Sequence, residues 1–69
     1  MSEKTLALDT PEGILEAALR KEKASYNFYD NLLKNTRVDI LVEILDQLRG
    51  EEYRHIRIIE KKLAEMGLG

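Results

Sequence analysis

The fold is decided by residues 41–63, whose sequence is LVEILDQLRGEEYRHIRIIEKKL. Large side chains recur there every three or four residues, which is the period of an amphipathic α-helix. We expect this helix to run from about residue 38 to residue 66, because Gly67 follows two lysines near its end. The stripe that should face a partner helix consists of Leu41, Ile44, Leu45, Leu48, Glu52, His55, Ile59 and Leu63.

A second helix is predicted upstream of this stretch, from residue 11 to about residue 34. Thr10 can cap it, Pro11 suits the first helical position, and Glu12 lies at the positive end of the helix dipole. Residues 35–37 break the period and predict a tight connection, so the two helices form an antiparallel hairpin. The stripe of the first helix consists of Leu15, Ala18, Leu19, Glu22, Ser25, Tyr26, Tyr29, Leu32 and Leu33.

The size of the chain predicts that the hairpin needs a second copy. A chain of 69 residues holds one domain, and it buries only about 60% of the surface that its unfolded form exposes. There is no cysteine, which excludes disulfides, iron–sulfur clusters and thiolate zinc sites. Several apolar residues fall outside the expected stripe of the second helix: Ile40, Val42, Ile56 and Ile58. We therefore expect an all-α fold, with an N-terminal arm over residues 1–9 and a hairpin over residues 10–69 that dimerises into a four-helix bundle.

Charge and hydropathy exclude several classes of partner. The formal net charge is −2, with 11 basic and 13 acidic residues, so no basic surplus is present to neutralise nucleic acid. No apolar run approaches the roughly 18 residues that span a bilayer, and the first residues do not resemble a secretory signal. A cytoplasmic protein is expected, either free or inside a protein compartment.

Three ionisable residues interrupt the apolar stripes. Glu22 and Glu52 are equally distant from the connection, so they should face each other across an antiparallel hairpin. His55 follows Glu52 by three residues and lies on the same face of its helix. Buried carboxylates are costly unless they are paired or bind a metal. Two carboxylates and an imidazole at one height indicate a metal site, although Glu22 alone would also fit a salt bridge between the helices.

The same residues carry a resemblance to a known family. Residues 22–29, EKASYNFY, resemble the first-helix motif of the ferritin-like, rubrerythrin-related di-iron carboxylate proteins. Residues 50–55, GEEYRH, resemble the Glu-x-x-His motif of that family. The resemblance covers about residues 14–63. Glu-x-x-His alone is common by chance, and the upstream glutamate at matching height makes the signal more specific.

The chain departs from the full-length family in having one half-site instead of two. The resemblance therefore implies a site assembled between two copies, as in the short, encapsulated-ferritin-like members. No cysteine is present to hold the iron of a C-terminal rubredoxin domain. A single hairpin encloses no storage cavity, so mineral storage would require a higher oligomer or a compartment shell.

The resemblance also implies roles for individual residues. Glu52 would bridge two iron ions, Glu22 would be a terminal ligand, and His55 would complete each iron site. Tyr29 or Tyr26 would hydrogen-bond a ligand carboxylate, although core packing is the simpler reading of both tyrosines.

The chemistry implied is a ferroxidase-type oxidation of Fe(II) by O₂ or peroxide, with two iron ions per dimer. The same oxygen and nitrogen donors would also accept Mn or Zn. The alternative is a helical hairpin without catalysis that dimerises or docks on a partner.

Overall fold

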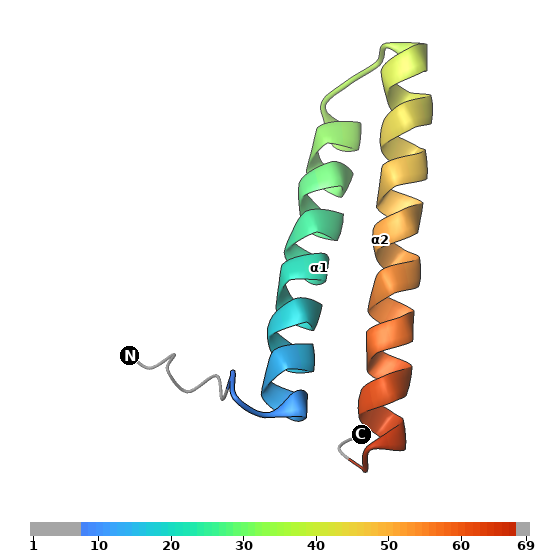
Figure 1. Cartoon of the computed structure of the whole chain (residues 1–69). Coiled ribbons are helices and arrows are strands. Elements are labelled where there is room, and N and C mark those ends of the chain that lie inside the picture. The colour runs from blue at the N-terminus through green and yellow to red at the C-terminus, as the bar shows by residue number, and fades with distance from the viewer. Residues whose placement is uncertain (1–7, 68–69) are drawn as a thin grey trace.

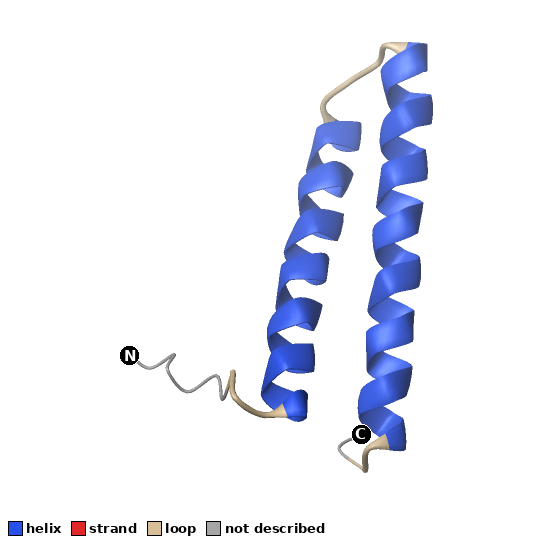
Figure 2. Cartoon of the chain, in the orientation of Figure 1, coloured by secondary structure: helices blue, strands red, loops and turns tan. Residues whose placement is uncertain are grey.

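The computed structural model describes residues 8–67, which form two antiparallel helices joined by a short connection (Figure 1). The first helix, α1, is Pro11–Lys34, and the second, α2, is Asp39–Glu65. The described part of the chain contains no strand (Figure 2). The all-α hairpin is therefore confirmed, and α2 begins and ends within one residue of the prediction. Most of the predicted arm, residues 1–7, lies outside the described residues.

The ends of the helices follow the local sequence. The Thr10 side chain accepts a hydrogen bond of 3.0 Å from the Gly13 N–H, which caps α1, and Pro11 is its first residue. Val38 precedes α2 and makes no side-chain cap. At the other end, Gly67 has φ +82°, a left-handed conformation that glycine adopts without the steric cost of a Cβ atom.

The two helices meet along a line of side chains that we call the contact seam. None of its members is fully exposed. On α1 the seam consists of Leu15, Leu19, Glu22, Tyr26, Tyr29 and Leu33, and on α2 of Leu45, Arg49, Glu52, Ile56, Ile59 and Leu63.

The seam corrects one sequence-based expectation. Ile56 was expected outside the contact stripe, but it is 9% exposed and is one of two buried apolar side chains among the described residues, with Leu63. Leu41 and Ile44, which were expected in the stripe, are each 45% exposed. The expected stripe had merged two neighbouring faces of α2, only one of which contacts α1.

The two sides of the hairpin differ in polarity. We call front face the residues that immediately precede seam residues, and back face those that immediately follow them. Because the helices are antiparallel, a displacement in the same sense along both chains leads to the same side of the hairpin. On α1 the back face is polar throughout, with Glu16, Arg20, Lys23, Asn27, Asp30 and Lys34.

On the front face, seven of the twelve residues are apolar. Ile14, Phe28 and Ile58 belong to it and are 53%, 58% and 64% exposed. Within residues 8–67 only two apolar side chains are buried, which is a smaller core than a scaffold of this size needs. In the described part of the chain, neither helix combines the length and the apolar character needed to cross a membrane.

Candidate metal centre

Glu22, Glu52 and His55 come together in the middle of the hairpin. Each offers one ligand-type atom, and these atoms all lie within 4.8 Å of one another. His55 Nδ1 is 3.3 Å from Oε1 of Glu22 and 3.7 Å from Oε1 of Glu52. The convergence predicted by counting residues from the connection is therefore present in the structure.

The fold explains why these three side chains meet. Glu22 and Glu52 are seam residues on opposite helices, and His55 is on the front face one turn beyond Glu52. The Glu22 and Glu52 side chains are 20% and 18% exposed, while His55 is 51% exposed. The cluster is thus closed by the seam on one side and open toward the front face on the other.

The two carboxyl groups perturb each other's protonation. The hydrogen bond between them lowers the pKa of Glu22, and contact with His55 lowers it further. The same hydrogen bond, together with burial and the charge of Glu22, raises the pKa of Glu52. The two carboxyl groups therefore lose their protons in separate steps, since like charges at this distance repel.

One oxygen of Glu52 lacks a partner. Its Oε1 is buried, makes no hydrogen bond, and lies too far from Nδ1 of His55 to form one. A buried oxygen without a partner is costly, and a bound cation would satisfy it. Two carboxylates and one imidazole are a donor set that fits Fe(II), Mn(II) or Zn(II). The residues present therefore fit a metal, and Glu22, Glu52 and His55 are those that would hold it.

The two candidate tyrosines differ in position. Tyr26 packs on Tyr53 of α2, with ring centroids 6.4 Å apart, and the Arg49 guanidinium lies 5.9 Å from its centroid. The ring of Tyr29 lies 5.5 Å from that of Phe28. Among the described residues, neither tyrosine hydrogen-bonds Glu22 or Glu52, so the expected support of a ligand carboxylate stays a prediction.

Sequence reasoning missed a second polar contact across the seam. The Arg49 guanidinium donates to Asp30 on α1, and it also binds Asp46 on its own helix at 3.0 Å. Lys34 binds Asp30 as well, at 3.3 Å. Hydrogen bonds to both cations lower the pKa of Asp30. Counting from the connection places Asp30 opposite Ile44, and the long Arg49 side chain spans the remaining five residues. A shared height therefore did not signal this contact.

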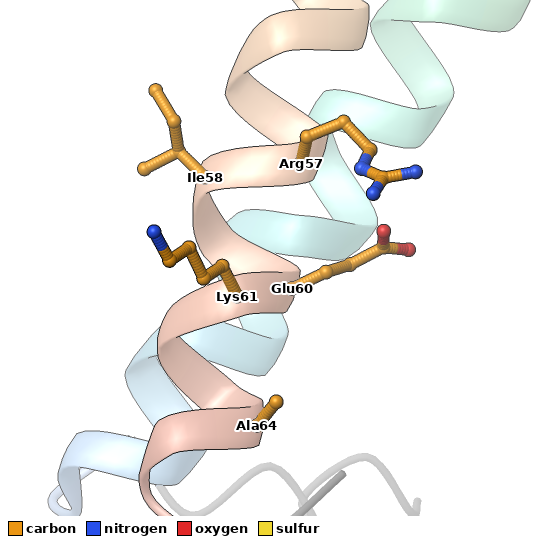
Figure 3. Close-up of a pocket in the computed structure, with 5 residues that line it drawn as sticks. All are labelled: Arg57, Ile58, Glu60, Lys61 and Ala64. Atoms are coloured by element: carbon orange, nitrogen blue, oxygen red, sulfur yellow. The ribbon is translucent and has the colours of Figure 1, made fainter.

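The surface hollows do not coincide with the cluster. A hollow of about 490 Å³ lies along α2 near its C-terminal end (Figure 3). Its lining residues are Arg57, Ile58, Glu60, Lys61 and Ala64. None of the three cluster residues lines it, and a single helix supplies the whole lining. We therefore place the candidate site at the cluster, where the chemistry of the side chains converges.

In comparisons with protein-family models, curated proteins and solved structures, nothing matches this chain.

Proposed function

We propose that two copies of this chain form a ferritin-like four-helix bundle and bind two iron ions between them, which O₂ or peroxide then oxidises. The observation that carries the proposal is the convergence of Glu22, Glu52 and His55, with a buried carboxylate oxygen that lacks a partner. The exposed front face supports a second copy, because its apolar side chains lie on the side to which the cluster is open.

A second copy also completes the ligand set. One chain offers two carboxylates and one imidazole, which leaves a metal ion short of ligands. Two chains offer four carboxylates and two imidazoles, the set that di-iron carboxylate bundles use. The four negative charges balance two divalent cations. Glu52 would bridge the ions, Glu22 would be a terminal ligand and His55 would complete each ion's shell.

The position of the cluster suits a two-fold arrangement. The midpoint of α1 falls between Glu22 and Lys23, and the midpoint of α2 falls at Glu52. A two-fold axis perpendicular to the helices at this height would superimpose the full length of each hairpin on the other. The ligands of both copies would then lie at one level.

The reaction is a transfer of two electrons from two Fe(II) substrate ions. Each ion loses one electron, and O₂ takes up both electrons and two protons to become H₂O₂. With peroxide as the oxidant, H₂O₂ takes up two electrons and two protons and becomes two water molecules. The chain would hold the two ions side by side, and the apolar front faces would limit access of water.

The experiment adds Fe(II) aerobically to the purified chain and follows the ultraviolet absorbance of ferric iron bound to oxygen ligands. About two ions per dimer should be oxidised rapidly. His55→Ala and Glu52→Ala should abolish rapid oxidation while leaving the helix content by circular dichroism unchanged. Glu43→Ala, at an exposed glutamate of α2 outside the cluster, is the matched control. Unchanged absorbance and no bound metal in the natural chain would contradict the proposal.

The native metal is a separate measurement. Elemental analysis of protein purified without a chelator, followed by anomalous scattering at the cluster, would distinguish iron from manganese and zinc. If the protein contains zinc and oxidises no Fe(II), the metal site would be supported and the ferroxidase reaction would be contradicted.

The second candidate is a hairpin that dimerises or docks without catalysis, and the exposed front face favours it. Replacing Glu22, Glu52 and His55 together by leucine separates the two functions. If association is the whole function, the triple variant should associate as tightly as the natural chain. If the cluster is a metal site, the natural chain alone should bind metal and gain stability from it.

A further inference from the structure

The front face contains two regular patterns with the spacing of a coiled-coil seam. On α2 the positions alternate between four and three residues apart, through Ile44, Leu48, Glu51, His55 and Ile58. On α1 the same alternation runs through Ile14, Ala18, Lys21, Ser25, Phe28 and Leu32. Such a repeat lets a helix pack along its length against another helix. The front face therefore has the pattern of a helix-packing surface.

Both patterns are self-complementary about the same height. If α2 packs antiparallel to α2 of a second copy around Tyr53, Leu48 lies opposite the second copy's Ile58. If α1 packs in the same way around Lys23, Ala18 lies opposite the second copy's Phe28. The smallest apolar side chain of that pattern thus meets the largest. Lys23 and Tyr53 each lie one residue, about 1.5 Å, from Glu22 and Glu52 along their helices, so one two-fold axis close to the height of the cluster serves both helices.

The same register brings Glu51 to the imidazole of the second copy. Counting outward from Tyr53, Glu51 lies opposite the second copy's His55, just as Leu48 lies opposite Ile58. Glu51 is only partly exposed, and it makes no hydrogen bond or ion pair with any residue in the described range 8–67. A carboxylate that becomes buried in an interface requires a hydrogen-bond donor.

The Nε2 atom of His55 is positioned to make this contact. Its Nδ1 lies 3.3 Å from Glu22 and 3.7 Å from Glu52, on the side of the two carboxylates. Nε2 is across the ring from these carboxylates, and the side chain is 51% exposed toward the front face. When a metal binds Nδ1, the proton of a neutral imidazole is on Nε2, which then needs an acceptor.

We propose that Glu51 of each copy accepts a hydrogen bond from Nε2–H of the second copy's His55 across a two-fold interface between the front faces. Glu51 is then a positioning residue, because it holds the imidazole with Nδ1 directed at the metal. The inference rests on the proposed metal site for its effect on affinity, but its register can be tested without metal. Contacts of this kind change metal affinity by about 10-fold to 100-fold.

Cysteine cross-linking tests the register in the metal-free chain, which has no cysteine of its own. The variant Leu48→Cys with Ile58→Cys should oxidise to a covalent dimer, as should Ala18→Cys with Phe28→Cys. Within one chain each pair is ten residues apart on one helix, about 15 Å, which is too far for a disulfide. The four single variants should remain monomeric under oxidation, because equivalent residues would also be about 15 Å apart. Dimers from the single variants but not from the pairs would overturn the register.

Mixed dimers test the contact itself, with Co(II) as the spectroscopic probe. The first mixed dimer joins a chain carrying Glu51→Gln to a chain carrying His55→Ala, and retains one Glu51–His55 contact between chains. The second joins a chain carrying both changes to a natural chain, and retains none. The first should bind Co(II) at least about 10-fold more tightly than the second. The reverse order would assign Glu51 to the histidine of its own chain, and equal affinities would leave it no role; either overturns the proposal.

The two proposals fail differently. If the natural chain binds neither Co(II) nor Fe(II), the metal site and the role of Glu51 both fall, whereas cross-linking of the pairs still supports the interface. If the natural chain binds metal but neither pair cross-links, the metal site stands and the contact between Glu51 and the second copy's His55 is overturned. Glu43→Gln is the matched control for Glu51→Gln, and it should leave the Co(II) affinity unchanged.

Discussion

Polar groups cross the contact seam at two levels, and the two levels are in opposite states. At the first level, the Arg49 guanidinium lies between Asp30 and Asp46, so the positive and negative groups satisfy one another within one hairpin. At the second level, one turn further along α2, Glu52 meets Glu22, and one of its oxygens lacks a partner. The first level is a complete structural contact, and the second is complete only with a cation or a proton.

Metal binding should produce the largest difference between the two levels, because it should stabilise only the level of Glu22 and Glu52. Adding Fe(II) anaerobically, at a free concentration 100 times the Kd, should stabilise the folded protein by about 2.7 kcal/mol, because metal binds the folded form only. Thermal unfolding followed by circular dichroism measures the shift. The same addition to the Glu52→Ala variant should produce no shift. A shift of equal size in that variant would place the metal elsewhere.

Leucine substitutions of the acidic residues at the two levels should shift the Tm of the metal-free protein in opposite directions. Glu22→Leu with Glu52→Leu removes like charges and a buried oxygen without a partner, so the metal-free Tm should rise by about 5 °C. Asp30→Leu leaves Arg49 without its contact across the seam, so the Tm should fall by about 2–5 °C. Scanning calorimetry of both variants without metal tests the contrast. A fall in Tm for both variants would mean that Glu22 and Glu52 are already satisfied within one chain.

Substitution of Gly50 should have a smaller effect, and it tests the stability of α2 separately from metal binding. It lies in the middle of α2, and a Cβ atom added there would meet nothing within 4 Å. Gly50→Ala should therefore stabilise the protein by about 0.5–1 kcal/mol through helix propensity alone. Urea unfolding provides the measurement, and metal affinity should stay the same. A loss of stability would reveal a close approach by another chain at Gly50.

The smallest expected effect is the pH dependence of the metal-free protein, because two shifts of opposite sign partly offset each other. The raised pKa of Glu52 contributes stability that is lost as the pH rises through that pKa. The lowered pKa of Glu22 contributes stability that is lost as the pH falls through it. Stability should therefore be highest between the two pKa values. Tm measured across acidic pH tests this, and a monotonic rise with pH would contradict it.

Metal affinity should depend on pH in one direction only. Metal binding requires Glu52 to lose its proton, so affinity should fall as the pH drops through the raised pKa of Glu52. Titration of Co(II) at several pH values measures the linkage between metal binding and proton release. Affinity that is constant across this range would show that Glu52 is already ionised in the metal-free hairpin.

Much of the hairpin could be predicted because its signals are local. Thr10 and Pro11 mark the start of α1, Gly67 marks the end of α2, and the apolar period persists along both helices. The convergence of Glu22 and Glu52 followed from counting outward from the connection. The start of α2 followed from the break in the period at residues 35–37 and not from a cap, because Val38 offers no side-chain cap.

The arrangement around the seam could not be predicted in the same way. Two neighbouring faces of α2 are both rich in apolar residues, and the helical period alone does not say which one contacts α1. Ile56 was therefore excluded from the contact stripe, and Ile44 was included. The Asp30–Arg49 contact was missed for a related reason, since the expected stripe of α2 passed through Leu48 and did not include Arg49.

The hairpin shape also constrains how a single-chain version of the proposed dimer could be built. The start of α1 and the end of α2 lie at the same end of the molecule, opposite the connection (Figure 1). In the antiparallel two-fold arrangement, the second hairpin begins at the far end of the bundle. A gene duplication that fused two copies would have to join points about 40 Å apart, the length of α2. That requires a linker of at least about twelve extended residues, whereas a shorter one would force the tandem chains to pair with other molecules.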